Sequence, residues 1–405
     1  MSARTRDKQR SPLPLEGVRV LDVASILAGP TSAALFAEYG ADVIKVEDPA
    51  VGDQLRRYPP FHEDISLMWK LVGRNKRSVT ADLRTEDGRR IVKELAAQCD
   101  IVTLNYRPET LEKWGLDFPA WVEVKPDIVV LHVTAYGRTG PYANRPGFAR
   151  IGEAFAGLTH RTGFPGEEPV QSGYPLLGDG VTGLYGAFAL LLALRQRDAT
   201  GEPQLIDLGL YEPLLRLIED QVAAYDEDGR VMDRIGNANP HICPNGLFPT
   251  RDGRWAAVPA STDSLWRRLV GLIDAPELLV YDTNRIRLEH REEIEGKVAD
   301  FTKSHDLVDL VEVCAAAGIA CGPVYSIAEI MKDPHIAARG SIVSVDDADL
   351  GRKVQMASPA GRFSGFEARI DHLGARLGEH TDEVLSQMLG YSNAQIAELH
   401  SKGVV

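Results

Sequence analysis

The chain has 405 residues, with 45 basic and 58 acidic side chains and a formal net charge of -13. This length predicts two or three domains, and a composition of 44% hydrophobic and 25% charged residues is typical of a folded globular protein. The acidic balance argues against a nucleic-acid partner. The longest apolar run, Leu184–Leu194, is shorter than the roughly 20 residues that a membrane span needs, so we expect no membrane association.

The first 14 residues are basic and polar and lack an apolar segment, which predicts a flexible tail rather than a secretory signal. Four cysteines in the whole chain have neither the number of a disulfide framework nor the spacing of a zinc site. We therefore expect a cytoplasmic protein without a bound metal.

From residue 15 onward, short β-branched runs alternate with helical patterns. Strands are predicted over residues 18–23, 43–47, 101–104 and 128–133, and helices over residues 31–39 and 86–98 and near Trp121. About 25 residues separate the first two strands, which is the length of a βαβ crossover. The alternation predicts an α/β fold with a parallel sheet and helices on both faces.

Two apolar helices (151–158 and 180–195), a strand (204–208) and a helix (210–225) follow. A hairpin turned by Asp252-Gly253 joins strands 247–250 and 255–258, and helices are predicted over residues 264–273, 289–303 and 306–317. The last part of the chain contains a strand at 342–345 and two helices, which are too few to bury a core of their own. We predict a large domain over residues 15–228, a small domain over 229–330, and a C-terminal segment, 331–405, that returns to the large domain.

Ligands of an open parallel sheet bind beyond the carboxyl ends of its strands. Three segments at these ends, residues 24–30, 105–108 and 135–148, are rich in Gly, Pro, Asn or small residues, which allow a ligand to approach the backbone closely. Any one of them could equally be a tight turn. None contains the G-x-G-x-x-G fingerprint, which argues against a dinucleotide bound in the usual way.

Basic residues are concentrated between Ser66 and Lys93, a segment that contains eight basic and three acidic residues. Arginine offers bidentate contacts to phosphate, so this cluster suits a polyanionic small molecule. Some of these bases, such as Arg89 and Arg90, have the pattern of a solvated helix surface, whereas Arg77 and Arg84 flank a strand-like segment and are better placed.

The segment Gly178-Asp179-Gly180-Val181-Thr182-Gly183-Leu184-Tyr185-Gly186 opens an apolar helix that we expect to be buried. Asp179 occupies the expected N-cap position, near unpaired backbone N–H groups. Glycines at three-residue spacing leave room on one side of the helix for close packing. Taken alone, the pattern fits a simple helix cap as well as a reactive carboxylate.

The chain resembles the family III CoA-transferases along nearly its whole length from Leu15. The stretches that carry the resemblance are Leu-Glu-Gly-Val-Arg-Val-Leu-Asp (15–22), Ala-Gly-Pro (28–30), Gly-Ala-Asp-Val-Ile-Lys-Val-Glu (40–47), Asn-Lys-Arg-Ser (75–78), Gly-Asp-Gly-Val-Thr-Gly (178–183), Gly-Ile-Ala-Cys-Gly-Pro-Val (318–324) and Gly-Glu-His-Thr-Asp-Glu-Val-Leu (378–385). Their order and spacing together are specific.

The resemblance implies a Rossmann-like large domain built from both chain ends, a smaller α/β domain, and an interlocked homodimer. It implies transfer of CoA from an acyl-CoA donor to a carboxylic acid acceptor, with no tightly bound cofactor because the CoA thioester is itself a substrate. Asp179 would be the nucleophile that forms a mixed anhydride and then an aspartyl-CoA thioester, and backbone N–H groups near Gly180 would stabilise the oxyanion.

The same resemblance assigns CoA-binding positions in the turns and the basic cluster. They are Leu27, Ala28, Ala81, Asp82, Leu83, Arg84, Asn105, Tyr106, Arg107 and Lys113. Arg77 of the basic cluster and Phe148 complete the predicted CoA site. The chain departs from formyl-CoA transferase at Leu27, Asp48 and Phe148, where that enzyme has Gln, Arg and Tyr, and it lacks a recognisable glycine-rich loop. Formyl or oxalate specificity is therefore not expected.

Two alternatives stay open. An α-methylacyl-CoA racemase on the same fold would need a proton-carrying His where this chain has Phe148, and Phe carries no proton. A non-catalytic CoA-binding protein would need Asp179 to act only as a helix cap.

Overall fold

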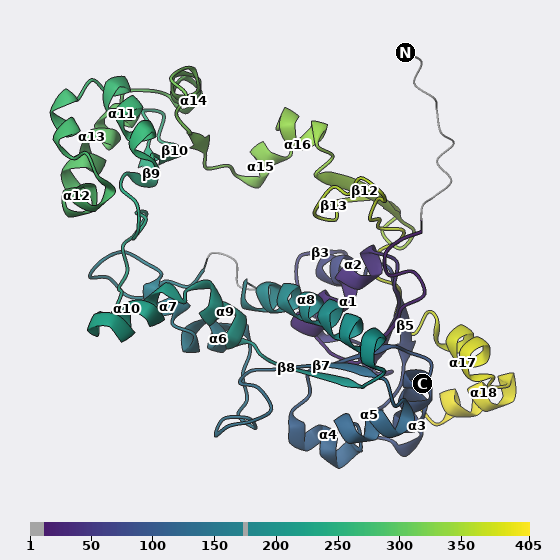
Figure 1. Ribbon diagram of the computed structural model, residues 1–405. Coiled ribbons are helices and arrows are strands. Elements are labelled where there is room, and N and C mark those ends of the chain that lie inside the picture. The colour runs from purple at the N-terminus through teal and green to yellow at the C-terminus, as the bar shows by residue number, and fades with distance from the viewer. Residues whose placement is uncertain (1–11, 173–176) are drawn as a thin grey trace. The chain divides into compact units, whose positions relative to one another are not determined.

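The computed structural model describes residues 12–172 and 177–405. These residues form two compact units, each of which is considered by itself (Figure 1). The first unit comprises residues 12–158, 172, 177–223 and 340–405, and the second comprises residues 159–171 and 224–339. Both ends of the described chain thus belong to the first unit. Residues 159–171 group with the second unit, which no pattern in the sequence indicated.

Six parallel strands form the central sheet of the first unit, in the order β5-β2-β1-β6-β7-β8. They are β1 (Arg19–Asp22), β2 (Asp42–Glu47), β5 (Lys76–Thr80), β6 (Ile101–Leu104), β7 (Val129–Thr134) and β8 (Gln204–Gly209). The order reverses between β1 and β6, which is where a doubly wound sheet forms its ligand crevice. The predicted parallel sheet is confirmed.

Alternate side chains of each central strand enter two different cores, because successive residues of a strand point to opposite faces. Val20 and Val43 pack under the helices of one face, while Leu21 and Ile44 pack under those of the other. The first face is covered by α1 (Ala28–Glu38) and α8 (Leu177–Thr200). The second is covered by α3 (Glu86–Ala96), α5 (Phe118–Val124), α17 (Thr381–Leu389) and α18 (Asn393–Ser401). Helices on both faces were predicted, and both are present (Figure 1).

Shorter elements complete the first unit. They are a 3-10 turn (Gln54–Arg57), β3 (Phe61–His62), β4 (Ile65–Ser66), α2 (Leu67–Val72), α4 (Pro108–Trp114), α6 (Ala149–Phe155), α9 (Tyr211–Leu217), β12 (Ile342–Asp347) and β13 (Arg352–Ala357). The single helix predicted over residues 210–225 is wrong, because the backbone leaves the helical conformation at Ile218 and restarts as α10 (Asp220–Asp228). The strand β13 was not predicted, although its buried Val354 and Met356 alternate with exposed polar residues as in a half-buried strand.

The second unit has a three-stranded antiparallel sheet in the order β11-β10-β9. The predicted hairpin is confirmed: β9 (Asn245–Pro249) pairs with β10 (Trp255–Pro259), and Gly253 adopts the positive φ that the turn requires. The other elements are β11 (Gly322–Pro323), a 3-10 turn (Pro276–Val280) and helices α11 (Asp263–Leu272), α12 (Asn284–Glu289), α13 (Arg291–Lys303), α14 (Leu307–Ala316), α15 (Ile327–Ile330) and α16 (Pro334–Ala338). The short helix α7 (Leu158–Arg161) lies where the two units divide.

Candidate active site

The turns that follow the parallel strands lie in a row along the carboxyl edge of the sheet, in the order of the strands. The turn after β1 and the turn after β6 are joined directly. The Ser25 N–H donates to Asn105 Oδ1 at 2.9 Å, and Asn105 Nδ2 donates to the Ser25 carbonyl at 2.7 Å. His132 Nε2 lies 2.6 Å from the Tyr106 carbonyl and so links the second turn to β7. Leu27 and Asn105, predicted from distant parts of the chain, are therefore brought together where the strand order reverses.

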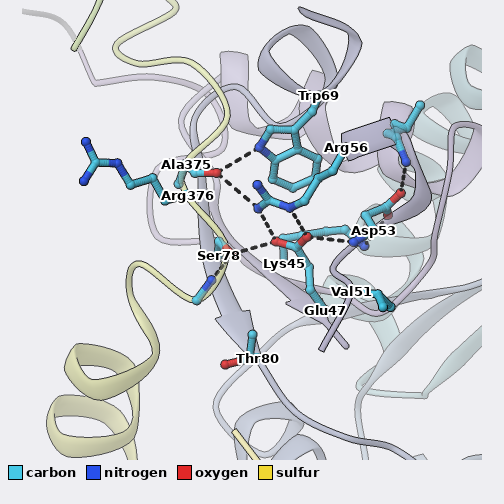
Figure 2. A network of polar contacts seen from close by, with 12 residues as sticks. Lys45, Glu47, Val51, Asp53, Arg56, Trp69, Ser78, Thr80, Ala375 and Arg376 are labelled. Atoms are coloured by element: carbon cyan, nitrogen blue, oxygen red, sulfur yellow. Dashed lines mark hydrogen bonds and ion pairs between the residues drawn. The ribbon is translucent and has the colours of Figure 1, made fainter. Parts of the chain in front are cut away.

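A buried polar network supports the turn after β1 (Figure 2). Lys45 Nζ lies 3.2 Å from Asp53 Oδ2, and both side chains are at most 2% exposed. Lys45 also donates to the carbonyl of Ala24, and Asp53 accepts the N–H of Ile26. The ammonium and the carboxylate thus fix two residues of the same turn.

Beside this network, Arg56 forms a bidentate pair with Glu47, at 2.7 and 2.8 Å. The Arg56 guanidinium lies 3.8 Å from the ring centroid of Trp69. Both Arg56 and Trp69 donate to the carbonyl of Ala375, at 3.1 and 2.8 Å, as Figure 2 shows. These contacts hold the C-terminal segment against the N-terminal part of the sheet.

A second buried ion pair lies within the sheet itself. Lys76 Nζ is 2.8 Å from Asp22 Oδ2, and it also donates to the carbonyl of Pro30 at 2.7 Å. Burial alone would raise the pKa of the Asp22 carboxyl, but Lys45 and Lys76 outweigh it and hold this pKa below its ordinary value. Lys76 therefore ties the sheet to the first turn of α1, and Lys45 ties it to the turn before that helix.

The basic residues predicted to bind CoA divide into two groups. Arg84 follows β5 at the carboxyl edge, where it pairs with Asp82 at 2.7 Å and with Asp48 at 3.0 Å. Arg77 lies near the amino end of β5 and pairs with Asp42 at 2.6 Å, so the structure does not bring it to the other predicted residues. Lys113 on α4 is exposed.

The remaining predicted CoA positions follow the same edge. Ala81 and Leu83 are buried directly after β5, whereas Arg107 is exposed after β6. Tyr106 is half-buried and makes an edge-to-face contact with Trp114, at 5.2 Å between ring centroids. The carboxyl edge of the sheet thus carries a few exposed cationic side chains next to buried apolar residues.

Asp179 lies in the first turn of α8, which begins at Leu177. The predicted N-cap position is therefore corrected: the carboxylate belongs to the helix rather than preceding it. A Cβ at Gly183 would approach the Thr31 side chain to 2.7 Å and the Ala28 carbonyl to 3.1 Å, so the second turn of α8 contacts the first turn of α1. Among residues 12–172 and 177–405, a Cβ at Gly180 would meet nothing within 4 Å, which leaves space beside Asp179 in the described part of the chain.

Glu153 on α6 is the acidic neighbour of this turn, and the sequence analysis missed it. Its side chain is buried, and its Oε1 accepts the N–H of Gly178 at 3.0 Å. Burial raises the pKa of Asp179 to about 6, and the nearby Glu153 carboxylate adds to that rise. In the described part of the chain, no basic side chain contributes to the pKa of Asp179. The available signal was a single acid within the apolar pattern of residues 151–158.

Phe148 immediately precedes α6 and is 67% exposed. A Cβ at Gly178 would lie 3.2 Å from the Ala149 Cβ, so the start of α6 adjoins the turn that carries Asp179. The residue predicted at the racemase base position is thus near the carboxylate, but it is an aromatic hydrocarbon that cannot exchange a proton.

Comparison with known proteins agrees with this geometry. The model of CoA-transferase family III matches residues 15–381. The beta subunit of succinyl-CoA–L-malate CoA-transferase from Chloroflexus aurantiacus is 42% identical over 98% of this chain and 100% of its own length. Human succinyl-CoA:glutarate CoA-transferase is 32% identical over 97% of this chain and 90% of its own. A solved CaiB/BaiF family protein from Brucella suis superposes with a TM-score of 0.81, at 32% identity, over 93% of this chain and 100% of that one.

The chain therefore belongs to CoA-transferase family III. It is an enzyme that moves CoA from an acyl-CoA thioester to a carboxylic acid, as the sequence predicted. Both open alternatives, the racemase and the non-catalytic CoA-binding protein, are thereby set aside.

Proposed function

We propose that the chain transfers CoA from a dicarboxylic acyl-CoA such as succinyl-CoA to a small hydroxy or dicarboxylic acid, through an aspartyl-CoA thioester on Asp179. The observation that carries this proposal is the half-buried carboxylate at the start of α8, which has open space beside it and a pKa raised to about 6. The names of similar enzymes, which include malate, citramalate and glutarate transferases, support this class of acids.

The reaction balances without net proton transfer. An Asp179 carboxylate oxygen attacks the thioester carbonyl carbon, the C–S bond breaks, and CoA leaves as a thiolate. The thiolate attacks the aspartyl carbonyl of the mixed anhydride and releases the donor acid, which leaves CoA joined to Asp179. The acceptor carboxylate then attacks this thioester, and the returning thiolate takes the acceptor acyl group and regenerates Asp179.

The surroundings of Asp179 suit this sequence. A carboxylate with a raised pKa is a stronger nucleophile than an ordinary one, and it remains mostly ionised at neutral pH. The first turn of α1 and the second turn of α8 adjoin at Ala28 and Gly183, and the positive ends of both helices stabilise the oxyanion and the thiolate. Leu27 caps α1 without a side-chain hydrogen bond, so backbone N–H groups there are available to a ligand.

The CoA moiety follows the carboxyl edge of the sheet in this proposal. Leu27, Asn105 and Tyr106 line the crevice where the strand order reverses. Arg84, Arg107 and Lys113 are exposed beyond it and can meet phosphate groups. For Arg84, phosphate would replace Asp82 and Asp48 as partners, which makes its contribution smaller than that of a free arginine.

We further propose a homodimer, in which the first unit of each copy is the large Rossmann-like domain and the second unit is the small domain. The support is α8, whose Leu184, Phe188 and Leu192 are each more than half exposed. By length and composition this helix could cross a membrane, but its Gly183 and Gly186 are packed tightly against α1. A second copy of the chain is the occupant that covers the exposed stripe. Replacing Phe188 and Leu192 by Ser should give monomers in light scattering, and an unchanged dimer would contradict this assignment.

Isotope exchange tests the proposed reaction. The enzyme is incubated with succinyl-CoA and labelled succinate but with no second acid, and label should enter succinyl-CoA because the first half-reaction is reversible. Asp179→Asn should abolish exchange. Asp198→Asn is the matched control, since Asp198 lies at the other end of α8 and is exposed, and it should exchange normally. Exchange in Asp179→Asn at the wild-type rate would overturn the proposal.

A further inference from the structure

Ile26, in the turn after β1, has an unusual backbone conformation. Its φ is +67°, in the left-handed region, where a β-branched residue is a genuine outlier. Four described non-glycine residues have positive φ, and the other three are Glu63, Asn75 and Asp274, which are not β-branched. Such a conformation persists only where the surrounding structure imposes it, and it is concentrated at functional sites.

The constraint on Ile26 comes from Asp53. Both carboxylate oxygens of Asp53 lie 3.2 Å from the Ile26 nitrogen. Asp53 is itself fixed, because its N–H donates to Glu47 at 2.9 Å, its Oδ1 accepts the Leu55 N–H at 2.9 Å, and its charge is paired with Lys45. Figure 2 shows Asp53, Lys45 and Glu47 within one connected network.

The two residues before Ile26 are held by further hydrogen bonds. Ser25 exchanges two hydrogen bonds with Asn105, and the Ala24 carbonyl accepts from Lys45. Within this turn Ile26 has the positive φ, and the residue that follows is Leu27, which caps α1 without a side-chain hydrogen bond. The direction of Leu27 and of the first turn of α1 depends on the left-handed conformation of Ile26.

We propose that Asp53 is a positioning residue that holds Ile26 in this conformation and so places Leu27 and the start of α1 for acyl-CoA. The inference rests on the proposed function of the crevice. Asp53 touches neither the substrate nor Asp179 in this account. Asp53 acts through the Ile26 backbone. Its effect on acyl-CoA binding is larger when residue 26 is β-branched, because such a residue disfavours positive φ.

A double-mutant cycle tests the proposal, because glycine adopts positive φ without cost. The variants are Asp53→Ala, Ile26→Gly and the double variant, and the readouts are Kd for CoA by calorimetry and kcat/KM for succinyl-CoA. Asp53→Ala should raise the Kd for CoA and lower kcat/KM for succinyl-CoA, each by about tenfold or more. Ile26→Gly alone should change each value by less than about threefold. In the Ile26→Gly background, Asp53→Ala should cause a much smaller loss of CoA affinity and of kcat/KM.

Two controls keep the test decisive. Ile26→Val retains the β-branch, so it should not rescue Asp53→Ala. If Asp53→Ala fails to fold, Asp53→Asn is used in the same cycle, since it keeps the shape and one acceptor oxygen but loses the charge paired with Lys45. Equal losses in the wild-type and Ile26→Gly backgrounds would overturn the inference. Because CoA binding is measured separately, a failure of the proposed transfer reaction would appear as binding without turnover.

Discussion

Two parts of the first unit differ in how they accommodate buried charge. Beneath the turn after β1, Lys45 pairs with Asp53 and Lys76 pairs with Asp22, each with additional hydrogen bonds. At the start of α8, the acids Glu153 and Asp179 lie together, and no described cation offsets the charge of Asp179. The charges of the first part are paired, which suits the proposed surface for the CoA portion of the substrate. The second keeps a carboxylate in an unfavourable charged state, which suits a group that must react.

The charge at the start of α8 also changes during the proposed reaction. When Asp179 becomes a neutral thioester, its repulsion with Glu153 disappears, and so does the cost of burying its charge. The covalent intermediate is thereby stabilised relative to the free carboxylate. The paired network under β1 has no such change, so substitutions in the two parts should have different consequences.

Removing the reactive carboxylate should have the largest effect. Asp179→Asn should lose at least about a thousandfold in kcat for CoA transfer, since it removes the nucleophile while preserving shape. Circular dichroism and CoA calorimetry should show a folded protein that still binds CoA. Activity within about tenfold of wild type would contradict the role of Asp179.

Breaking a buried ion pair should have the largest effect on stability. Asp22→Asn leaves Lys76 buried without its carboxylate, and we expect a loss of about 3–5 kcal/mol in the free energy of unfolding. Asp87→Asn is the control, because its pair with Arg90 is exposed to solvent and should contribute little. Urea denaturation checks both, and similar small losses would contradict the charge pairing that we describe under β1.

The same substitution of Asp179 should stabilise the fold. A carboxyl whose folded pKa is raised to about 6 costs stability once it ionises, so its contribution is fully favourable below its ordinary value of 3.8 and is lost as the pH rises through about 6. The free energy of unfolding of Asp179→Asn should therefore exceed that of the wild type by about 1–2 kcal/mol at pH 8. The difference should vanish at acidic pH, and a destabilised variant at pH 8 would argue that Asp179 is a structural cap.

Glu153 should affect the pH profile more than the fold. The wild-type kcat/KM should fall as the pH drops through about 6, because protonation removes the nucleophile. Glu153→Gln removes the negative charge but keeps an oxygen that can accept the Gly178 N–H, so the acid limb should move to lower pH. Glu153→Ala loses both and should also lose stability. An unshifted limb in Glu153→Gln would mean that burial alone sets the pKa of Asp179.

The smallest expected effects concern the glycines of α8. Gly183→Ala should weaken the packing of α8 on α1, because the added Cβ meets Thr31 and the Ala28 carbonyl. Gly180→Ala meets nothing and should be neutral or stabilising by about 0.5–1 kcal/mol in thermal unfolding. Equal losses in both variants would show that the open space beside Asp179 is filled in solution.

The sheet could be predicted because β-branched runs buried on both faces leave a clear pattern, and Asn105 and Leu27 could be placed because strand ends share one edge. The exposed face of α8 could not be predicted. A helix that is apolar on all sides is expected to be buried, but its sequence does not tell whether its own chain or a second chain covers it. Arg77 was assigned to the CoA site because it belongs to the basic cluster beside a strand-like segment, but the pairing of β5 with β2 places it near the opposite edge beside Asp42. The position of Glu153 beside Asp179 results from the contact between α6 and α8, and the local sequence does not reveal that contact.

The most direct test is mass spectrometry of enzyme quenched in acid during turnover with succinyl-CoA. The account predicts that the peptide containing Asp179 carries CoA through a thioester, which hydroxylamine removes and which Asp179→Asn never forms. If the peptide stays unmodified while transfer proceeds, or if CoA is attached at another residue, the central claim is contradicted.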